Sequence, residues 1–249
     1  MAGHSKWANI KHRKSRQDAK RGKLWSKCAR AIIAAAKNGG GNPETNLTLR
    51  YAIDEAKAAN MPKDTIENAI KKGAGQVETE SYESIVYEGY GPGGIAIMLD
   101  ILTDNRNRTA SEVRKTFEKY GGNLGASGCV AYLFQSRGQF YVNKKAIDED
   151  RLYAVTIEAG ADDIIDDGDS WQILSDPADF LAVLQALDEV EAKTESAQIT
   201  MVPNTTITCT GSEAEKLLNL IENLEDLDDI QKVHANFEIP DEQIAAMEP

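Results

Sequence analysis

Residues 84–102 read SIVYEGYGPGGIAIMLDIL, and this stretch separates two kinds of predicted structure. Before it, apolar residues recur every three or four positions, which is typical of amphipathic helices. Within it the period falls to about two, which is typical of strands. Residues 84–90 and 95–102 are therefore predicted to be two strands, joined into a hairpin by GPGG at 91–94.

Three helices are predicted before the hairpin. The first spans about 17–37, and its apolar face contains Leu24, Cys28, Ile32 and Ala36 at intervals of four residues, widened by Trp25, Ala29 and Ile33. The glycines of NGGGNP end it, and Pro43 prevents its continuation. The second covers about 44–60, and the third runs from Pro62 to Gly73. Residues 1–15 lack this period, so 1–75 are predicted to be a basic, extended arm and a small helical domain.

The elements after the hairpin predict two α/β domains. A helix is expected at 109–122 with Thr109 and Glu112 as a capping box, followed by strands at 129–136 and 138–142. Residues 136–202 show the strand–helix–strand–strand–helix–strand order of a ferredoxin-like domain. The flanking segments, 76–135 and 203–249, would then form one discontinuous α/β domain. The predicted fold class is α+β multidomain: an N-terminal three-helix domain followed by two ferredoxin-like α/β domains, one inserted in the other.

Charge is strongly segregated along the chain, whose net charge is −12. Residues 1–75 hold 16 Lys/Arg and 6 Asp/Glu, whereas residues 76–249 hold 12 and 34. Residues 1–37 alone hold 11 Lys/Arg and a single acid, Asp18. A solvated helix face is the alternative interpretation, but such faces usually mix signs because opposite charges four residues apart stabilise a helix. We therefore predict that residues 1–37 bind a polyanion.

The predicted nucleic-acid contacts come from the arm and from the helix face opposite the apolar one. Trp7 would stack on an unpaired base or, alternatively, anchor the arm on the helices. The contact residues are Lys6, Trp7, Lys11, His12, Arg13, Lys14, Arg16, Lys20, Arg21, Lys23, Lys27 and Arg30.

A second anion site is predicted at Arg106 and Arg108, just before the expected helix at 109. Two arginines beside the free N–H groups of a helix start would form an anion pocket. Alternatively, these arginines pair with Asp104, with Glu112 or with acids of EDLDD at 225–229. Both interpretations stay open at the level of sequence.

Neither a catalytic nor a metal site is predicted, and no cofactor is expected. The glycine-rich stretches at 91–94 and 121–128 lack the strand–loop–helix order of a phosphate loop and are interpreted as tight turns. His4, His12 and His234 have no metal-ligand spacing, and the three cysteines lie far apart, as expected for reduced thiols in a cytoplasmic protein. No apolar run has membrane-spanning length, so no membrane partner is expected. The sequence leaves the oligomeric state open.

Several motifs, in order along the whole chain, resemble the YebC/PmpR family. They are MAGHSKWANIKHRK, DAKRGKLWSK, NMPKDTIENAIKKGAG, YEGYGPGG, TDNRNRTASEVR, GGNLGASGCVAYLF and LEDLDDIQKVHANFEI. The resemblance implies a three-domain architecture and a cytoplasmic, non-enzymatic regulator of gene expression. Bacterial members are commonly called transcriptional regulators that bind DNA. The family also includes a mitochondrial translational activator of a cytochrome c oxidase subunit.

The resemblance therefore leaves two functions open. The first is DNA-binding transcriptional regulation. The alternative is a ribosome-associated translation factor that relieves stalling, for example at proline-rich stretches, by binding ribosomal RNA through its basic N-terminal segment.

Overall fold

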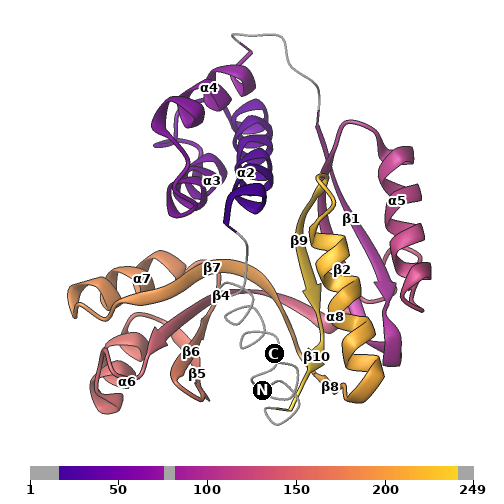
Figure 1. The fold of residues 1–249 in the computed structure, drawn as a ribbon. Coiled ribbons are helices and arrows are strands. Elements are labelled where there is room, and N and C mark those ends of the chain that lie inside the picture. The colour runs from indigo at the N-terminus through magenta and orange to yellow at the C-terminus, as the bar shows by residue number, and fades with distance from the viewer. Residues whose placement is uncertain (1–16, 76–81, 241–249) are drawn as a thin grey trace. The chain divides into compact units, whose positions relative to one another are not determined.

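The computed structural model describes residues 17–75 and 82–240, with only the backbone described for residues 17–21. These residues form two compact units, each built around one four-stranded sheet (Figure 1). The first unit comprises residues 17–75, 82–130 and 211–233. The second comprises residues 131–210 and 234–240.

The first unit begins with three helices, as the apolar spacing predicts. They are α2 (Gln17–Gly39), α3 (Leu47–Ala58) and α4 (Lys63–Gly73). Their apolar faces form one core, whose buried members lie between Cys28 and Ala69. The side chain of Asn46 fixes the connection between α2 and α3. Its oxygen accepts the Leu49 N–H at the start of α3, and its amide donates to the carbonyls of Ala35 and Gly40.

Leu24 is a correction to the predicted apolar face of the first helix. Its side chain is 47% exposed, whereas Cys28, Ile32 and Ala36 are buried as predicted. At this turn of α2 the inward position belongs to Trp25, which packs against the helical core and donates from Nε1 to the Ala59 carbonyl at 3.0 Å. The apolar face therefore starts one residue later than the i, i+4 series from Leu24 predicts.

The predicted hairpin forms the centre of the first sheet, whose strand order is β3-β1-β2-β9. The short 3-10 turn Pro92–Gly94 joins the two hairpin strands. Two helices supply Val113, Phe117, Leu217 and Leu220 to the buried core of this unit. These elements are β1 (Glu83–Tyr90), β2 (Ala96–Thr103), α5 (Arg106–Lys119), β3 (Asn123–Leu124), α8 (Gly211–Glu225) and β9 (Ile230–Ala235).

The second unit has the ferredoxin-like element order predicted for residues 136–202. Its sheet has the order β5-β6-β4-β7 with every neighbouring pair antiparallel, and Phe140 of β4 stacks on Phe180 of α7 with ring centroids 4.9 Å apart. A parallel pair, β8 (Ile207–Thr208) and β10 (Phe237–Glu238), follows. The main elements are β4 (Phe134–Asn143), α6 (Glu149–Glu158), β5 (Ala161–Asp167), β6 (Ser170–Ser175), α7 (Phe180–Glu189) and β7 (Thr194–Pro203).

One pair of predicted strands is a single element in the structure. The strands expected at 129–136 and 138–142 form the continuous β4, preceded by a 3-10 turn at Ala131–Leu133. β4 continues through Gly138 because its residues on both sides pair with β7, which is equally long. The boundary expected between residues 135 and 136 falls inside this strand, and the predicted domain limits stay a prediction.

The predicted fold class is confirmed: N-terminal helices are followed by antiparallel sheets with helices. Across residues 17–75 and 82–240, no helix is both long enough and apolar enough to cross a membrane.

Gly89 provides a test of the packing in the first sheet. A Cβ at this position would lie 2.5 Å from the backbone oxygen of Asn123 and 3.0 Å from the Phe117 ring. We expect Gly89→Ala to lower the free energy of unfolding by about 2 kcal/mol, because the β1–β3 pair must shift. Chemical denaturation followed by circular dichroism measures this change.

Gly22→Ala is the matched control, because a Cβ on this residue of α2 would meet no described atom within 4 Å. We expect this helix substitution to leave stability unchanged or to raise it by up to about 1 kcal/mol. Equal destabilisation by both substitutions would contradict the close approach at Gly89.

Candidate nucleic-acid interface

The structure describes three of the predicted nucleic-acid contacts in full. Lys23, Lys27 and Arg30 lie on one face of α2, which we call the cationic face. Lys20 and Arg21 belong to the same helix, but their side chains lie outside the described residues. The arm residues also lie outside the described part of the chain: Lys6, Trp7, Lys11, His12, Arg13, Lys14 and Arg16.

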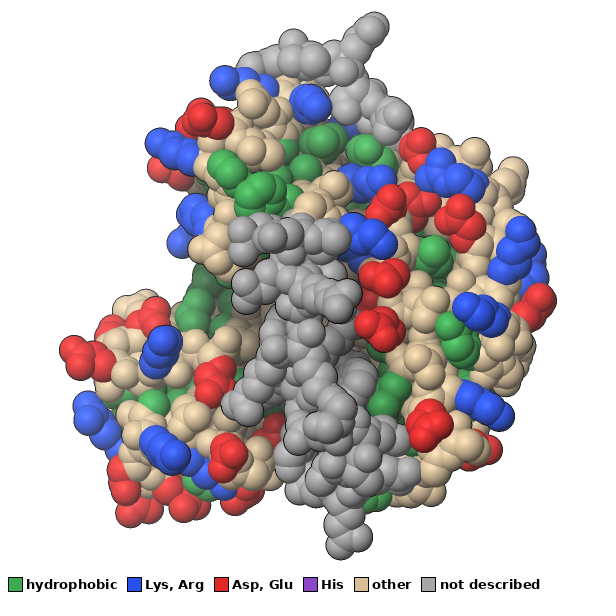
Figure 2. All heavy atoms as spheres, in the orientation of Figure 1, with side chains coloured by type: hydrophobic (Ala, Val, Ile, Leu, Met, Phe, Trp, Pro, Cys, Tyr) green, Lys and Arg blue, Asp and Glu red, His purple; other side chains and the backbone are tan. Residues whose placement is uncertain are grey.

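The cationic face contacts the segment between α8 and β9. This segment, residues 225–229 with the sequence EDLDD, is called the acidic turn below. Lys23 Nζ donates to the Asp226 carbonyl at 3.1 Å, and Lys27 Nζ donates to the Glu225 carbonyl at 2.6 Å. In the space-filling view, blue Lys/Arg and red Asp/Glu side chains adjoin where these segments meet (Figure 2). Lys23 is still 49% exposed, so the cationic face is only partly covered by these contacts, and its contact with nucleic acid stays a prediction.

Helix electrostatics explain why cations bind at this position. The last carbonyls of a helix have no partner within the helix, and the macrodipole makes that end negative. Glu225 is the last residue of α8, and its carbonyl accepts from Lys27. The acidic turn therefore offers both carbonyl oxygens and carboxylates to α2.

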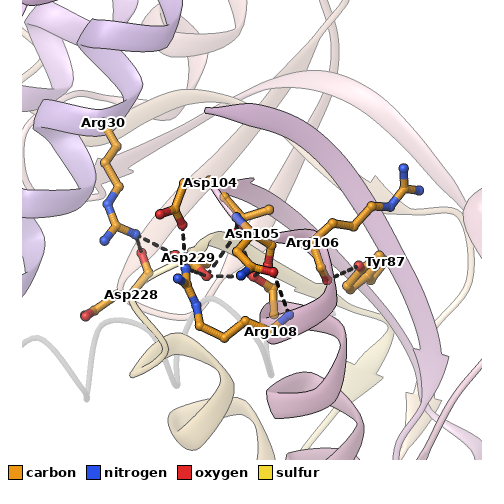
Figure 3. Close-up of polar contacts among 10 residues, drawn as sticks. Arg30, Tyr87, Asp104, Asn105, Arg106, Arg108, Asp228 and Asp229 are labelled. Atoms are coloured by element: carbon orange, nitrogen blue, oxygen red, sulfur yellow. Dashed lines mark hydrogen bonds and ion pairs between the residues drawn. The ribbon is translucent and has the colours of Figure 1, made fainter. Parts of the chain in front are cut away.

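Arg30 extends these contacts into the body of the first unit (Figure 3). Its Nη1 donates to the Asp228 carbonyl at 2.7 Å and to Oδ1 of Asp229 at 2.8 Å. The guanidinium group also lies over the Tyr82 ring, 5.6 Å from its centroid. Tyr82 itself packs against the helical core. Arg30 thus connects the helices to the acidic turn.

Asp229 is the acceptor on which this cluster converges. Its carboxylate is only 5% exposed, and Oδ2 accepts from Arg108 Nη2 at 2.8 Å, from Thr109 Oγ1 at 2.6 Å and from Thr103 Oγ1 at 3.2 Å. Burial alone would raise the pKa of Asp229. The hydrogen bonds from Thr109 and Arg108 and the charges of Arg108 and Arg30 outweigh burial, so this pKa lies below its ordinary value. Asp229 is therefore a buried anion whose charge is compensated from several elements.

The helix after β2 starts earlier than predicted, which changes the surroundings of Arg106 and Arg108. Asn105 caps α5 by accepting the Arg108 N–H, so both arginines lie in the first turn of the helix. Thr109 is therefore an internal helix residue whose hydroxyl binds Asp229, and the predicted capping box with Glu112 is wrong. The apolar positions Val113 and Phe117 were assigned correctly.

Both arginines have carboxylate partners in the structure. Arg108 pairs with Asp104 at 2.7 Å and with Asp229, which agrees with the alternative that assigned it to Asp104 and EDLDD. Arg106 pairs with Glu83 at 3.3 Å, a partner that was not predicted. An external anion at Arg106 and Arg108 would have to compete with these carboxylates, and the anion site stays a prediction.

A similar internal anion lies at the glycine-rich loop after α5. Glu88 of β1 is buried, and its carboxylate accepts the N–H groups of Gly128 at 2.6 Å and Val130 at 2.8 Å. The amide groups that a phosphate loop would offer to a ligand are here bound by a side chain of the protein. This arrangement accounts for the loop as a structural turn.

Two of the described thiols, those of Cys28 and Cys129, do not have the properties of catalytic nucleophiles. Cys28 is buried, and burial, with a smaller contribution from Glu55, raises its pKa to about 11. Burial, followed by the charge of Glu88, also raises the pKa of Cys129. Both thiols are therefore protonated at neutral pH, whereas the thiolate is the nucleophile. Within residues 17–75 and 82–240, no group of three or more His, Cys, Asp or Glu side chains could hold a metal ion.

Comparison with known proteins gives full-length matches. Residues 5–76 match a family model described as the TACO1/YebC protein N-terminal domain, and residues 82–237 match one described as the TACO1/YebC second and third domain. A probable transcriptional regulatory protein of Dictyoglomus thermophilum is 52% identical over 99% of this chain and 100% of its own length. A protein of the same description from Natranaerobius thermophilus is 54% identical over 97% of this chain and 98% of its own.

A solved structure is similar to this chain in both sequence and fold. The crystal structure of a conserved hypothetical protein from Aquifex aeolicus is 50% identical and aligns with a TM-score of 0.80. The alignment covers 90% of this chain and 93% of that protein.

The substitution Asp229→Asn tests how much the buried, charged carboxylate of Asp229 stabilises the fold. We expect it to lower the free energy of unfolding by about 2 kcal/mol near neutral pH, because hydrogen bonds to a charged acceptor are removed. A folded-state pKa below the unfolded one stabilises the protein above the unfolded value, about 3.9 for Asp. The difference between wild type and variant should therefore be constant above about pH 5 and shrink as the pH falls below about 4. Chemical denaturation across this pH range measures it.

Asp228→Asn is the control for this substitution, since the structure uses the carbonyl of Asp228 to bind Arg30. We expect it to change stability by less than about 0.5 kcal/mol. A destabilisation equal to that of Asp229→Asn would mean that the charge of the turn, and not the hydrogen bonds of Asp229, provides the stability.

Proposed function

The chain belongs to the TACO1/YebC family, and we propose that it is a non-enzymatic, cytoplasmic regulator of gene expression that binds nucleic acid through residues 1–37. The resemblance predicted from the sequence motifs is confirmed by the family models and by the curated relatives. The proposal requires no cofactor and no membrane.

The observation that carries this proposal is the segregation of charge. Residues 1–37 hold 11 Lys/Arg against one acid, and the chain from residue 76 onward holds 34 acids against 12 Lys/Arg. Lys and Arg side chains that neutralise phosphates release condensed counterions, which supplies most non-specific affinity for nucleic acids. The rest of the chain repels a polyanion, so contact would concentrate on the N-terminal segment.

Duplex DNA is the first candidate ligand. The relatives from Dictyoglomus and Natranaerobius are named probable transcriptional regulatory proteins. The residues of the N-terminal segment are suited to phosphate contact, which positions a protein on DNA without reading its sequence. We therefore expect affinity for DNA with a steep dependence on salt and only modest sequence preference.

Ribosomal RNA is the second candidate, and the charge of the second unit favours it. Residues 131–210 contain 15 Asp/Glu and five Lys/Arg. A long duplex offers such a surface only repulsion, whereas the ribosome presents basic proteins next to RNA. In this alternative the basic segment would bind ribosomal RNA, and the acidic unit would face the proteins.

Charge reversal in the arm tests the proposal. The variant carries Lys11→Glu, Arg13→Glu and Lys14→Glu, which changes no described contact. We expect affinity for duplex DNA and for an RNA hairpin to fall by about tenfold or more at low salt. The slope of log affinity against log salt should become shallower by about 0.7–0.9 for each phosphate that the arm no longer neutralises. Fluorescence anisotropy measures both, and sedimentation with purified ribosomes tests the second candidate.

The control reverses three cations of α5 through Arg114→Glu, Lys115→Glu and Lys119→Glu, with the same change in net charge. If affinity falls equally in both variants, the effect is one of net charge and the N-terminal segment is not the binding site. If the arm variant binds DNA, RNA and ribosomes as tightly as wild type, the proposal is wrong. Co-sedimentation without preference for any duplex would favour ribosomal RNA over DNA.

A further inference from the structure

We propose that the acidic turn is an internal competitor for nucleic acid: it occupies the cationic face of α2 in the free protein and gives it up when a polyanion binds. This inference rests on the proposed function, because the competing ligand is the nucleic acid that residues 1–37 are proposed to bind. It adds a regulated state to that binding, in which part of the cationic surface is covered until the ligand arrives.

The competitor and the ligand would use the same donors. Lys23, Lys27 and Arg30 bind oxygen atoms of the acidic turn. Four of these oxygens lie within 3.1 Å of a nitrogen atom of these side chains, and a fifth, Asp226 Oδ1, lies at 3.8 Å. These oxygens are carbonyls and carboxylates, which are acceptors only, as are the oxygens of a phosphodiester. A phosphate backbone would therefore compete with the acidic turn for the donors of the cationic face. Lys20 and Arg21 precede Lys23 in the sequence of α2.

The contacts of Lys23 with the turn are of the kind that a ligand can displace. The side chains of Lys23 and Asp226 are 49% and 53% exposed, and an exposed ion pair is weak and screened by salt. The Arg30 side chain is 22% exposed. A nucleic acid would offer these cations several phosphates at once and release counterions when they bind, which the internal acids do not.

Each side of this contact, the acidic turn and the cationic face, is held in place without the other. The acidic turn remains fixed to the body through Asp229, which Arg108, Thr103 and Thr109 bind from β2 and α5 independently of α2. The helical part has its own buried core, whose members all come from residues 28–69. Release of the α2 contacts therefore leaves both partners folded, with the turn on the sheet and the cationic face uncovered.

Neutralising the acidic turn tests the competition in the full-length protein. Asp226→Asn combined with Asp228→Asn removes its two exposed carboxylates and leaves Asp229 in place. We expect affinity for duplex DNA and an RNA hairpin to rise by about fivefold at low salt, the gain that partly exposed ion contacts allow. The control, Glu112→Gln with Glu118→Gln on α5, removes the same charge from the same unit. Affinity in the control should rise less than about twofold. Equal gains in both variants would overturn the competition.

A zero-length carbodiimide cross-link between Lys23 and Asp226 reports the contact directly, since the two groups are 3.8 Å apart. The probes are the DNA duplex, the RNA hairpin and inorganic polyphosphate, and the pair Lys144–Asp166 of the second unit is the internal control. We expect each bound probe to reduce the Lys23–Asp226 product by about fivefold or more, as competition for one site requires, and to leave the Lys144–Asp166 product unchanged.

The outcomes separate this inference from the proposed function. If nucleic acid binds and the amount of Lys23–Asp226 cross-link stays constant, the proposed competition is wrong and the proposed function stands. If polyphosphate suppresses the Lys23–Asp226 cross-link while neither the DNA nor the RNA binds, the acidic turn does compete with a polyanion, but nucleic acid is not the ligand. If no probe binds or changes the product, both are wrong.

Discussion

The first unit depends on one buried anion, the carboxylate of Asp229. Taking a charge out of water is costly unless partners compensate it, and here the partners come from α2, β2 and α5. Each of these elements is placed by its own apolar packing, but Asp229 fixes how they meet at the start of β9. Because Thr103 and Thr109 are also buried, the cluster is closed on the side of the sheet and partly open toward α2. In the proposed competition, the attachment to the sheet would remain while a ligand displaces the contacts with α2.

The same principle recurs elsewhere in the chain. Glu88 binds the backbone amides of the glycine-rich loop, and Asp166 binds the amide of Gly168 in the β5–β6 turn together with Lys144. The chain thus uses its own carboxylates as the anions that bind its backbone amides and cationic side chains. Glycine-rich or arginine-rich stretches predict that an anion binds, but they do not say whether it belongs to the protein.

The regular elements could be predicted from sequence because their signals are local. Apolar spacing located α2, α3 and α4, and the change of period located the β1–β2 hairpin. Errors arose where two local signals compete. Thr109 followed by Glu112 resembles a helix start, but Asn105 caps α5 four residues earlier, and the Thr109 hydroxyl instead binds Asp229, some 120 residues away. Leu24 and Trp25 both fit the apolar face of α2, and the acceptor at Ala59 favours Trp25.

The candidate site shows why charge counting along a sequence is incomplete. A run of Lys and Arg with one acid indicates a polyanion partner, and the sequence suggests EDLDD only as a partner for Arg106 and Arg108. Its contact with α2 spans about 200 residues of sequence and has no local signal. The general signal is the end of a helix rich in acids, since free carbonyls and carboxylates coincide there. A long basic helix and an acidic helix end within one chain should be considered as mutual partners before either is assigned to an external ligand.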